Sequence, residues 1–487
     1  MRASLVFRSV VALLLFAGFY LLAFAMVLFL SWLAYIQFVL ERGNLMIAFF
    51  GVTTAGVIAW SLLPRGERFR PPGPLLSPEK HPELFSMIRE VARATGGEMP
   101  SEVYLVPGVN AFVTRRGGVL GLFDRPVMGL GLPLLALLTV SQLQAVLAHE
   151  LGHFHAGDTR LGPWIYALRA AIGRTIIGLA KRGFIRKPFE WYGMMFLRVT
   201  RGISRYQELA ADRLAARAVG APHLMSALKT VHAGSVAYQT FHRDEYEQIL
   251  QAGYRAPLAE GFGAYFRAEQ ERGALDDVVA EEIEFPLRHV LDTHPPLVER
   301  LQALAAETAP PTPDDDRLAL MLLGDDDLDG EVCYPEVGER LTELSWAEVP
   351  RRVLLPSWRK QAALFAGATV GELPMSSRAL TTLGERLSEE DLGERPDLAA
   401  QLGARVLAAA LSAALVADGY RVRYRVGRPI ELRKDERRLY PFRDFRALAV
   451  GALSVEEMKA RLSDQVLRLP VLAAARRART GRRQGTP

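Results

Sequence analysis

The chain has 487 residues, half of them hydrophobic, with a formal net charge of +5 and a pI near 9.3. This length predicts about two to four domains. No basic stretch is interleaved with aromatic residues as in nucleic-acid binders, so we expect no nucleic-acid partner. Cys333 is the only cysteine, which excludes an intrachain disulfide and a zinc site built on thiolates and fits a reducing compartment.

Two uncharged apolar runs open the chain, over residues 9–40 and 43–64. Each exceeds the roughly 18 residues that mark a membrane span, so we expect a transmembrane hairpin within residues 1–70, with spans at about 9–40 and 44–63. A cleaved signal peptide is disfavoured because the first run is too long and a second follows at once. Arginines at 2 and 8 precede the hairpin and arginines at 65, 68 and 70 follow it. Both ends, and all that follows Pro71, are therefore expected in the cytoplasm.

Short regular elements follow a proline-rich linker at residues 70–74. The patterns predict an amphipathic helix over 82–95 and β-strands over 103–106, 111–114 and 127–132. Residues 161–180 are apolar, but Arg169 and Arg174 interrupt them, which favours a core or interfacial helix over a third span. The stretch 184–199 leaves the same two alternatives open.

The segment His149-Glu150-Leu151-Gly152-His153 has the H-E-x-x-H pattern. Ser141 and Gln144 form a capping-box pair before it and Gly157 follows it, which predicts a helix over 142–156. On this helix the two histidines lie about 40° apart, beside an apolar stripe. Two imidazole nitrogens that bind zinc, with a carboxylate that takes a proton from its water, are typical of a zinc hydrolase. The alternative is a surface helix with two chance histidines.

A second helix, predicted over residues 204–219, carries Glu208 and Asp212 one turn apart. A catalytic zinc site takes three protein ligands, and Glu208 is the best third one. Asp212 could accept the second ring proton of a liganding histidine. The alternative is a solvated acidic face. His155, a rival ligand, is rejected because it lies about 120° or more around its helix from the motif histidines.

A change of composition near residue 310 predicts a domain boundary, since prolines at 310, 311 and 313 precede Asp314-Asp315-Asp316. We expect a metallopeptidase domain over 71–309, a C-terminal domain of unknown role over 310–475 and a basic tail over 476–487, which either rests on anionic lipid or is solvated. The patterns within the C-terminal domain predict helices near 337–346 and 395–417, a hairpin over 420–433 that turns at Gly427-Arg428-Pro429, and a capped helix from Ser454.

A second metal signal lies in the spacing of Asp325, Asp327, Asp329, Gly330, Val332 and Glu336, which matches a calcium-binding EF-hand loop. The loop is single where such hands usually pair, and Pro335 adjoins the last ligand. An acidic solvated loop is therefore the favoured interpretation.

Taken together, these motifs resemble the membrane zinc endopeptidases of the HtpX type, which are gluzincins related to the CAAX prenyl endopeptidases. The resemblance covers roughly residues 75–305. Its carriers are Asn110-Ala111-Phe112, the zinc motif with Asp158 five residues on, Ser204-Arg205 before Glu208-Leu209-Ala210-Ala211-Asp212, and Thr293-His294-Pro295-Pro296.

The resemblance implies one Zn²⁺ per chain, bound by His149, His153 and Glu208, with Glu150 as the general base. It also implies supporting roles for Asp158 and Asp212, and an edge strand at or beside Asn110, Ala111 and Phe112 that holds the substrate extended. His294 would meet the oxyanion or occupy the open position of the zinc; otherwise it is a loop residue that precedes a helix.

We therefore expect a mainly helical α+β protein: a transmembrane hairpin, a gluzincin-type domain with a small β-sheet, and a C-terminal α+β region. The expected function is hydrolysis of protein or peptide substrates by a multi-pass protease of the bacterial inner membrane type, with its catalytic domain in the cytoplasm and a role in membrane-protein quality control. The alternatives are a dedicated processing protease and a catalytically silent scaffold, which the intact ligands and base argue against.

Overall fold

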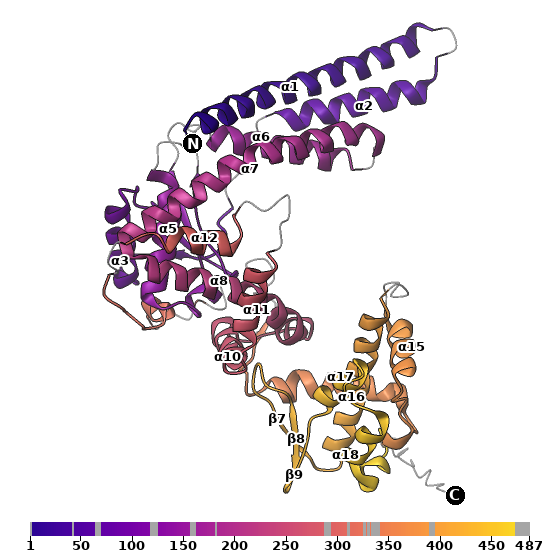
Figure 1. Cartoon of the computed structure of the whole chain (residues 1–487). Coiled ribbons are helices and arrows are strands. Elements are labelled where there is room, and N and C mark those ends of the chain that lie inside the picture. Colours follow the sequence, from indigo (N-terminus) through magenta and orange to yellow (C-terminus); the bar gives the residue numbers. More distant parts are fainter. Residues whose placement is uncertain are drawn as a thin grey trace, which may run out of the picture. The chain divides into compact units, whose positions relative to one another are not determined.

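The computed structural model describes residues 2–40, 43–63, 70–116, 125–155, 162–180, 183–286, 294–308, 312–324, 328, 332, 341–388 and 395–472 (Figure 1). They form two compact units: Met1–Val236 with Gly273–Pro335, and Ala237–Arg272 with Glu336–Pro487. Helices dominate both units, and each sheet is small. The predicted α+β class, mainly helical, is therefore confirmed.

The first two helices are α1 (Arg2–Val39) and α2 (Leu45–Leu62), which lie side by side (Figure 1). Asn44 caps α2, because its side-chain oxygen accepts hydrogen bonds from the backbone N–H groups of Met46 and Ile47. Gly51 allows close packing, since a Cβ there would lie 2.9 Å from the carbonyl oxygen of Leu30. Both helices are long and apolar enough to cross a membrane and expose large apolar side chains. They anchor the chain in the bilayer, as predicted.

Two further helices pack on this hairpin, α6 (Gly162–Gly178) and α7 (Gly183–Val219). Phe19, Ile58, Ile172 and Phe189 belong to the buried apolar cluster that they share. The hydroxyl of Tyr192 donates to the carbonyl oxygen of Leu15 at 2.6 Å. The helix predicted from residue 204 is thus the C-terminal half of a single helix of 37 residues.

The first unit contains a four-stranded sheet in the order β1-β2-β4-β3. Its strands are β1 (Leu75–Leu76), β2 (Glu102–Val106), β3 (Ala111–Arg116) and β4 (Arg125–Gly131). Strand β4 pairs in parallel with β2 and antiparallel with β3, which leaves β3 at an edge. The helices of this unit are α3 (Pro82–Thr95), α4 (Leu132–Leu135), α5 (Val140–His155), α8 (Ala221–Phe241), α11 (Ala274–Glu284) and α12 (Leu297–Leu304). The predicted strands and the helix over 82–95 are confirmed.

The N-terminal cap of α5 differs from the predicted one. Thr139 caps the helix: its hydroxyl accepts from the N–H of Gln142, and the side chain of Gln142 accepts from the N–H of Thr139. The predicted pair of Ser141 and Gln144 was wrong, because the Ser141 hydroxyl accepts instead from the N–H of Asp315 at 2.7 Å.

The segment beyond residue 310 continues the first unit. Backbone hydrogen bonds join the N–H of Val140 to the carbonyl of Arg317 and the N–H of Ala319 to the carbonyl of Leu138. A short 3-10 helix, η3 (Ala319–Leu323), follows. The division into domains at residue 309 stays a prediction. Because of these contacts, the first compact unit extends to Pro335.

The second unit is built around α16 (Pro396–Ala417), whose apolar residues are almost all buried. Helices α14 (Leu355–Ala362), α15 (Ser377–Leu387) and α17 (Pro441–Ala449) pack against it. The unit also contains α10 (Leu258–Glu271), α18 (Val455–Leu467) and a sheet of β7 (Arg421–Arg423), β8 (Glu431–Lys434) and β9 (Arg437–Leu439). Shorter pieces are η2 (His242–Tyr246), α9 (Glu247–Gln251), β5 (Tyr254–Arg255), β6 (Thr342–Glu343), η5 (Pro350–Leu354), η6 (Ala363–Phe365) and η7 (Val370–Glu372). The predicted hairpin, the helix over 395–417 and the Ser454 cap are confirmed.

Residues 341–346 are not helical, so that part of the predicted helix near 337–346 was wrong. Thr342 pairs with Tyr254 as β6 and β5, and this tertiary pairing overrides the local periodicity. The proposed calcium ligands Asp325, Asp327, Asp329, Gly330 and Glu336 lie outside the described residues, as do Gly157, Asp158 and the basic tail.

Candidate metal centre

Helix α5 supplies the two motif histidines. Leu143, Leu147 and Leu151 are buried and hold the helix in the core. Gly152, between the histidines, lies against α7, where a Cβ would be 3.4 Å from the Cα of Ala211. Small residues at this crossing bring the polar face of α7 close to the histidines.

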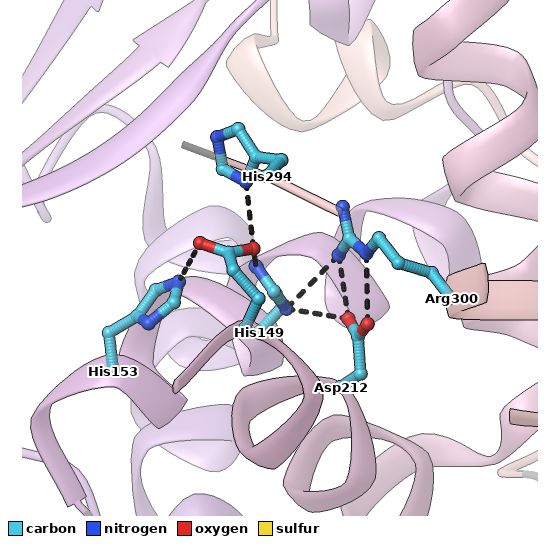
Figure 2. Close-up of polar contacts among 6 residues, drawn as sticks. His149, His153, Asp212, His294 and Arg300 are labelled. Atoms are coloured by element: carbon cyan, nitrogen blue, oxygen red, sulfur yellow. Dashed lines mark hydrogen bonds and ion pairs between the residues drawn. The ribbon is translucent and has the colours of Figure 1, made fainter. Parts of the chain in front are cut away.

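Glu208 of α7 completes a group of three donors (Figure 2). Its Oε2 lies 3.5 Å from Nε2 of His149, and its Oε1 lies 3.6 Å from Nε2 of His153. Ligand atoms at about 2.0–2.1 Å from a tetrahedral zinc ion are about 3.4 Å apart. Two imidazole nitrogens and one carboxylate with these separations fit zinc, and they leave its fourth position to water.

Asp212, one helical turn after Glu208, fixes the orientation of His149. Its Oδ1 lies 2.9 Å from Nδ1 of His149 and accepts that proton, which leaves Nε2 for the metal. Arg300 of α12 donates to the same carboxylate, from Nε to Oδ2 at 2.8 Å and from Nη2 to Oδ1 at 2.6 Å (Figure 2). Asp212 is 0% exposed and Arg300 9%, so the pair is shielded from water.

The sequence patterns did not predict Arg300 as a residue of the metal site. Charged residues of an amphipathic helix usually face solvent, so arginine in such a pattern draws no attention. One signal could have found it: Arg300 lies three residues after Leu297 and four before Leu304. It therefore shares the apolar face of α12 with these buried leucines.

The charges of the site follow from burial and close contacts. Burial opposes the ionisation of Glu208, but hydrogen bonds from His149 and His294 hold the pKa of Glu208 well below its usual range. Burial, together with the charge of His149, lowers the pKa of His153 to about 4. Burial also opposes the charging of His149, yet Asp212 and Glu208 outweigh it and raise the pKa of His149 to about 9. Glu208 and His153 are thus already in the deprotonated forms that bind metal.

Glu150 follows His149 on α5 and is half-buried. Burial raises the pKa of its carboxyl, and the nearby Glu208 adds to this effect. A carboxylate with a raised pKa beside a metal site is suited to accept a proton at neutral pH.

The predicted substrate strand lies at the edge of the sheet. Ala111 and Phe112 belong to β3, and the carbonyl of Asn110, just before it, accepts from the N–H of Gly131 at 2.8 Å. Phe112 covers Gly129 of β4, where a Cβ would lie 2.4 Å from the ring. The strand order places β3 at an edge of the described sheet, and contact of these residues with a substrate stays a prediction.

His294 reaches the metal group from outside α5 and α7. Its Nδ1 lies 2.7 Å from Oε2 of Glu208, and 59% of its side chain is exposed (Figure 2). The structure therefore brings His294 to a metal ligand. Its two predicted roles, at the oxyanion or at the open position of the metal, stay predictions.

Comparison with known proteins agrees with this geometry. The sequence model of Peptidase family M48 matches residues 78–308. The matched region is that of an M48 zinc metallopeptidase. The chain is 29% identical over 221 residues to Protease HtpX homolog 1 of Streptomyces coelicolor, covering 40% of this chain and 68% of that protein. It is 26% identical over 248 residues to the Protease HtpX homolog of Tropheryma whipplei, covering 47% of this chain and 74% of that protein.

Other relatives are matched over shorter stretches. The Protease HtpX homolog of Acaryochloris marina is 29% identical over 169 residues, which are 31% of this chain and 56% of that protein. No solved structure matches the chain significantly. The second unit lies largely outside the region that matches the M48 family.

Proposed function

We propose that this M48 peptidase is a membrane-anchored endopeptidase that cleaves protein substrates at the cytoplasmic face of the membrane. The observation that carries the proposal is the group of His149, His153 and Glu208, with Glu150 next to it on α5. When bound by these three ligands, zinc lowers the pKa of a bound water to about 7 and polarises a carbonyl oxygen.

The surrounding side chains transfer the proton, orient a ligand and stabilise negative charge. Glu150 accepts the proton of the attacking water and returns it to the leaving amine, a role suited to a carboxyl whose pKa burial has raised. Asp212, held by Arg300, keeps His149 in the tautomer that presents Nε2. His294, exposed and beside Glu208, donates to the oxygen that becomes negative during the attack.

Substrate binding is assigned to the edge of the sheet. Strand β3 is bonded to β4 on one side, and an extended peptide added on the other side gains main-chain hydrogen bonds. This mode selects unfolded or extended segments, because a folded strand is already paired. It supports a role in the removal of damaged membrane proteins, and Asn110, Ala111 and Phe112 are the proposed contacts.

The cytoplasmic location rests on the arginines that flank the hairpin, at 2 and 8 before α1 and at 65, 68 and 70 after α2. Cys333 is unique in the sequence and gives a direct test with a membrane-impermeant maleimide. We expect labelling after lysis and denaturation and none in intact cells. Labelling in intact cells would contradict the assignment.

Glu150→Gln tests the mechanism. Glutamine has the same size and stays polar but cannot act as a base, so we expect full zinc content and loss of casein cleavage, by about 100-fold or more. Glu90→Gln is the matched control, since Glu90 is exposed on α3, and it should cleave at the native rate. Native cleavage by Glu150→Gln would exclude Glu150 as the base.

A further inference from the structure

The sheet of the second unit has a row of arginines across its full width. Arg421 of β7 pairs directly with Arg433 of β8, which pairs directly with Arg438 of β9. Directly opposed residues share one face of a sheet, and Arg423, two residues from Arg421, shares it too. We name these four residues the arginine face.

The other face of this sheet is the core side, and its charges are paired. Leu432 is 0% exposed and Leu439 6%. The Nζ of Lys434 lies 2.8 Å from Oδ2 of Asp418, and Nη2 of Arg437 donates to the carbonyl oxygen of Leu462 at 3.0 Å. Basic residues on this side therefore stabilise the unit through contacts within the chain.

The arginine face has no acidic partner among the described residues. Arg421, Arg423 and Arg438 are exposed, and within the described part of the chain none of the four residues forms an ion pair. Arg433 donates from Nε to the backbone carbonyl of Asp435 at 3.0 Å, a neutral acceptor. Glu431, the one acid opposite Arg423, already accepts from the hydroxyl of Tyr440 at 3.2 Å.

Like charges placed directly opposite each other destabilise a sheet. The row of Arg421, Arg433 and Arg438 therefore does not stabilise the fold by itself. The arrangement becomes favourable only when anions lie against the three guanidinium groups. The guanidinium group binds phosphate oxygens in a bidentate manner, and neighbouring strands about 4.8 Å apart place successive groups within reach of adjacent phosphates. The geometry thus fits a surface of closely spaced phosphates.

We propose that the arginine face binds the anionic phospholipid headgroups of the membrane in which α1 and α2 anchor the chain. The anchor keeps the second unit near that bilayer at high effective concentration. Between Tyr420 and Tyr440 there are eight basic residues and three acidic ones, so the attraction extends over the whole sheet. The inference depends on the membrane anchor and is independent of the peptidase mechanism.

A single-stranded nucleic acid is the less suitable partner, because such sites add aromatic platforms on which bases stack. Tyr440, two residues beyond Arg438, is covered by the guanidinium of Arg443 at 4.3 Å from the ring centroid. The ring of Tyr420 lies under Lys434. A basic side chain of the chain itself thus already lies against each ring.

The test uses the full-length protein in nanodiscs, with Cys333→Ser and Glu436→Cys. Glu436 is exposed in the turn between β8 and β9, so a fluorophore there reports contact of the arginine face with lipid. The lipids carry a nitroxide quencher on the headgroup, and the discs contain phosphatidylcholine with or without phosphatidylglycerol. We expect quenching only with phosphatidylglycerol, and its loss at high salt because screening weakens exposed charges.

The triple variant Arg421→Gln, Arg423→Gln and Arg438→Gln should lower the ratio of docked to undocked protein roughly 100-fold, at about 1 kcal/mol for each arginine near an anionic surface. The matched control is Arg351→Gln, Arg352→Gln and Arg359→Gln, which removes the same charge from exposed residues of η5 and α14. The control should leave the quenching unchanged.

Three results would overturn the proposal. Equal loss of quenching in both triple variants would show that net charge alone is responsible. Equal quenching in discs without phosphatidylglycerol would show that the contact is not with anionic headgroups. The third result is absence of quenching together with binding of polyglutamate. If only the first triple variant loses that binding, the arginine face binds an acidic protein partner instead.

Discussion

Arg300→Met removes the buried partner of Asp212 and should strongly destabilise the first compact unit, which contains the metal site. Asp212 is fully buried and receives two hydrogen bonds from Arg300, at 2.6 and 2.8 Å. Methionine fills a similar volume but leaves the carboxylate with His149 as its remaining partner at this site. Loss of one member of a buried ion pair costs about 3–5 kcal/mol, because the other charge stays buried without compensation.

The assay is thermal unfolding of the full-length protein in detergent, combined with zinc content. A cost of this size lowers the midpoint by about 10 °C in a unit of this length. Arg217→Met is the matched control, since Arg217 is 67% exposed and pairs with Glu307 at 3.4 Å on the surface. It should cost about 0–1 kcal/mol.

A double variant separates the buried charge from the lost packing. Adding Asp212→Asn to Arg300→Met removes the uncompensated charge, so the double variant should recover most of the lost stability. If Arg300→Met costs no more than Arg217→Met, or if the double variant is no more stable than Arg300→Met, the reasoning about the buried pair is refuted.

Three further predictions follow from other parts of the structure. Removal of zinc by 1,10-phenanthroline should abolish cleavage, and stoichiometric zinc should restore it; activity that survives with no bound metal would contradict the zinc site. Gly129→Ala places a Cβ 2.4 Å from ring atoms of Phe112, which is too close, so the edge strand must shift. It should raise KM at unchanged zinc content, whereas Gly108→Ala, where a Cβ meets open space, should not. Glu245 accepts from the hydroxyl of Tyr424 at 2.7 Å, and burial raises its pKa to about 7. The folded state therefore holds a proton that the unfolded state loses above about pH 4.5, and the free energy of unfolding should fall by on the order of 2 kcal/mol between about pH 4.5 and 7. Glu245→Gln should flatten this slope in melting curves recorded across that range, and an unchanged slope would assign it to other groups.

The sequence predicted those parts of the fold and site that depend on local pattern. The helix over 82–95 has a clear apolar stripe, and the strands that follow are short, apolar and bounded by turn residues. The three metal ligands were found because two of them share one helical turn and the third stands in a recognisable helix of its own. Spacing along a helix fixes side-chain positions closely enough for such predictions.

Non-local contacts account for the parts that were missed. The place of Arg300 on an apolar helix face indicates that it is buried, but only the packing of α12 against α7 shows that its partner is Asp212. Helix α7 was expected to begin at residue 204, because its apolar first half and polar second half differ in composition although the backbone is one helix. The cap of α5 was misplaced because Ser141 bonds with Asp315, 174 residues away, and no local signal reports this partner.

The contact between the start of α5 and residues 315–319 affects the order in which the enzyme matures. During synthesis, α1 and α2 leave the ribosome first and can enter the bilayer while the rest of the chain is still being made. The zinc helix follows, but its N-terminal end is not closed until residues 315–319 have been translated. His294 and Arg300 also arrive late, so the two histidines of α5 are made long before their partners. The hairpin can therefore enter the membrane before the residues that complete the hydrolytic site have been translated.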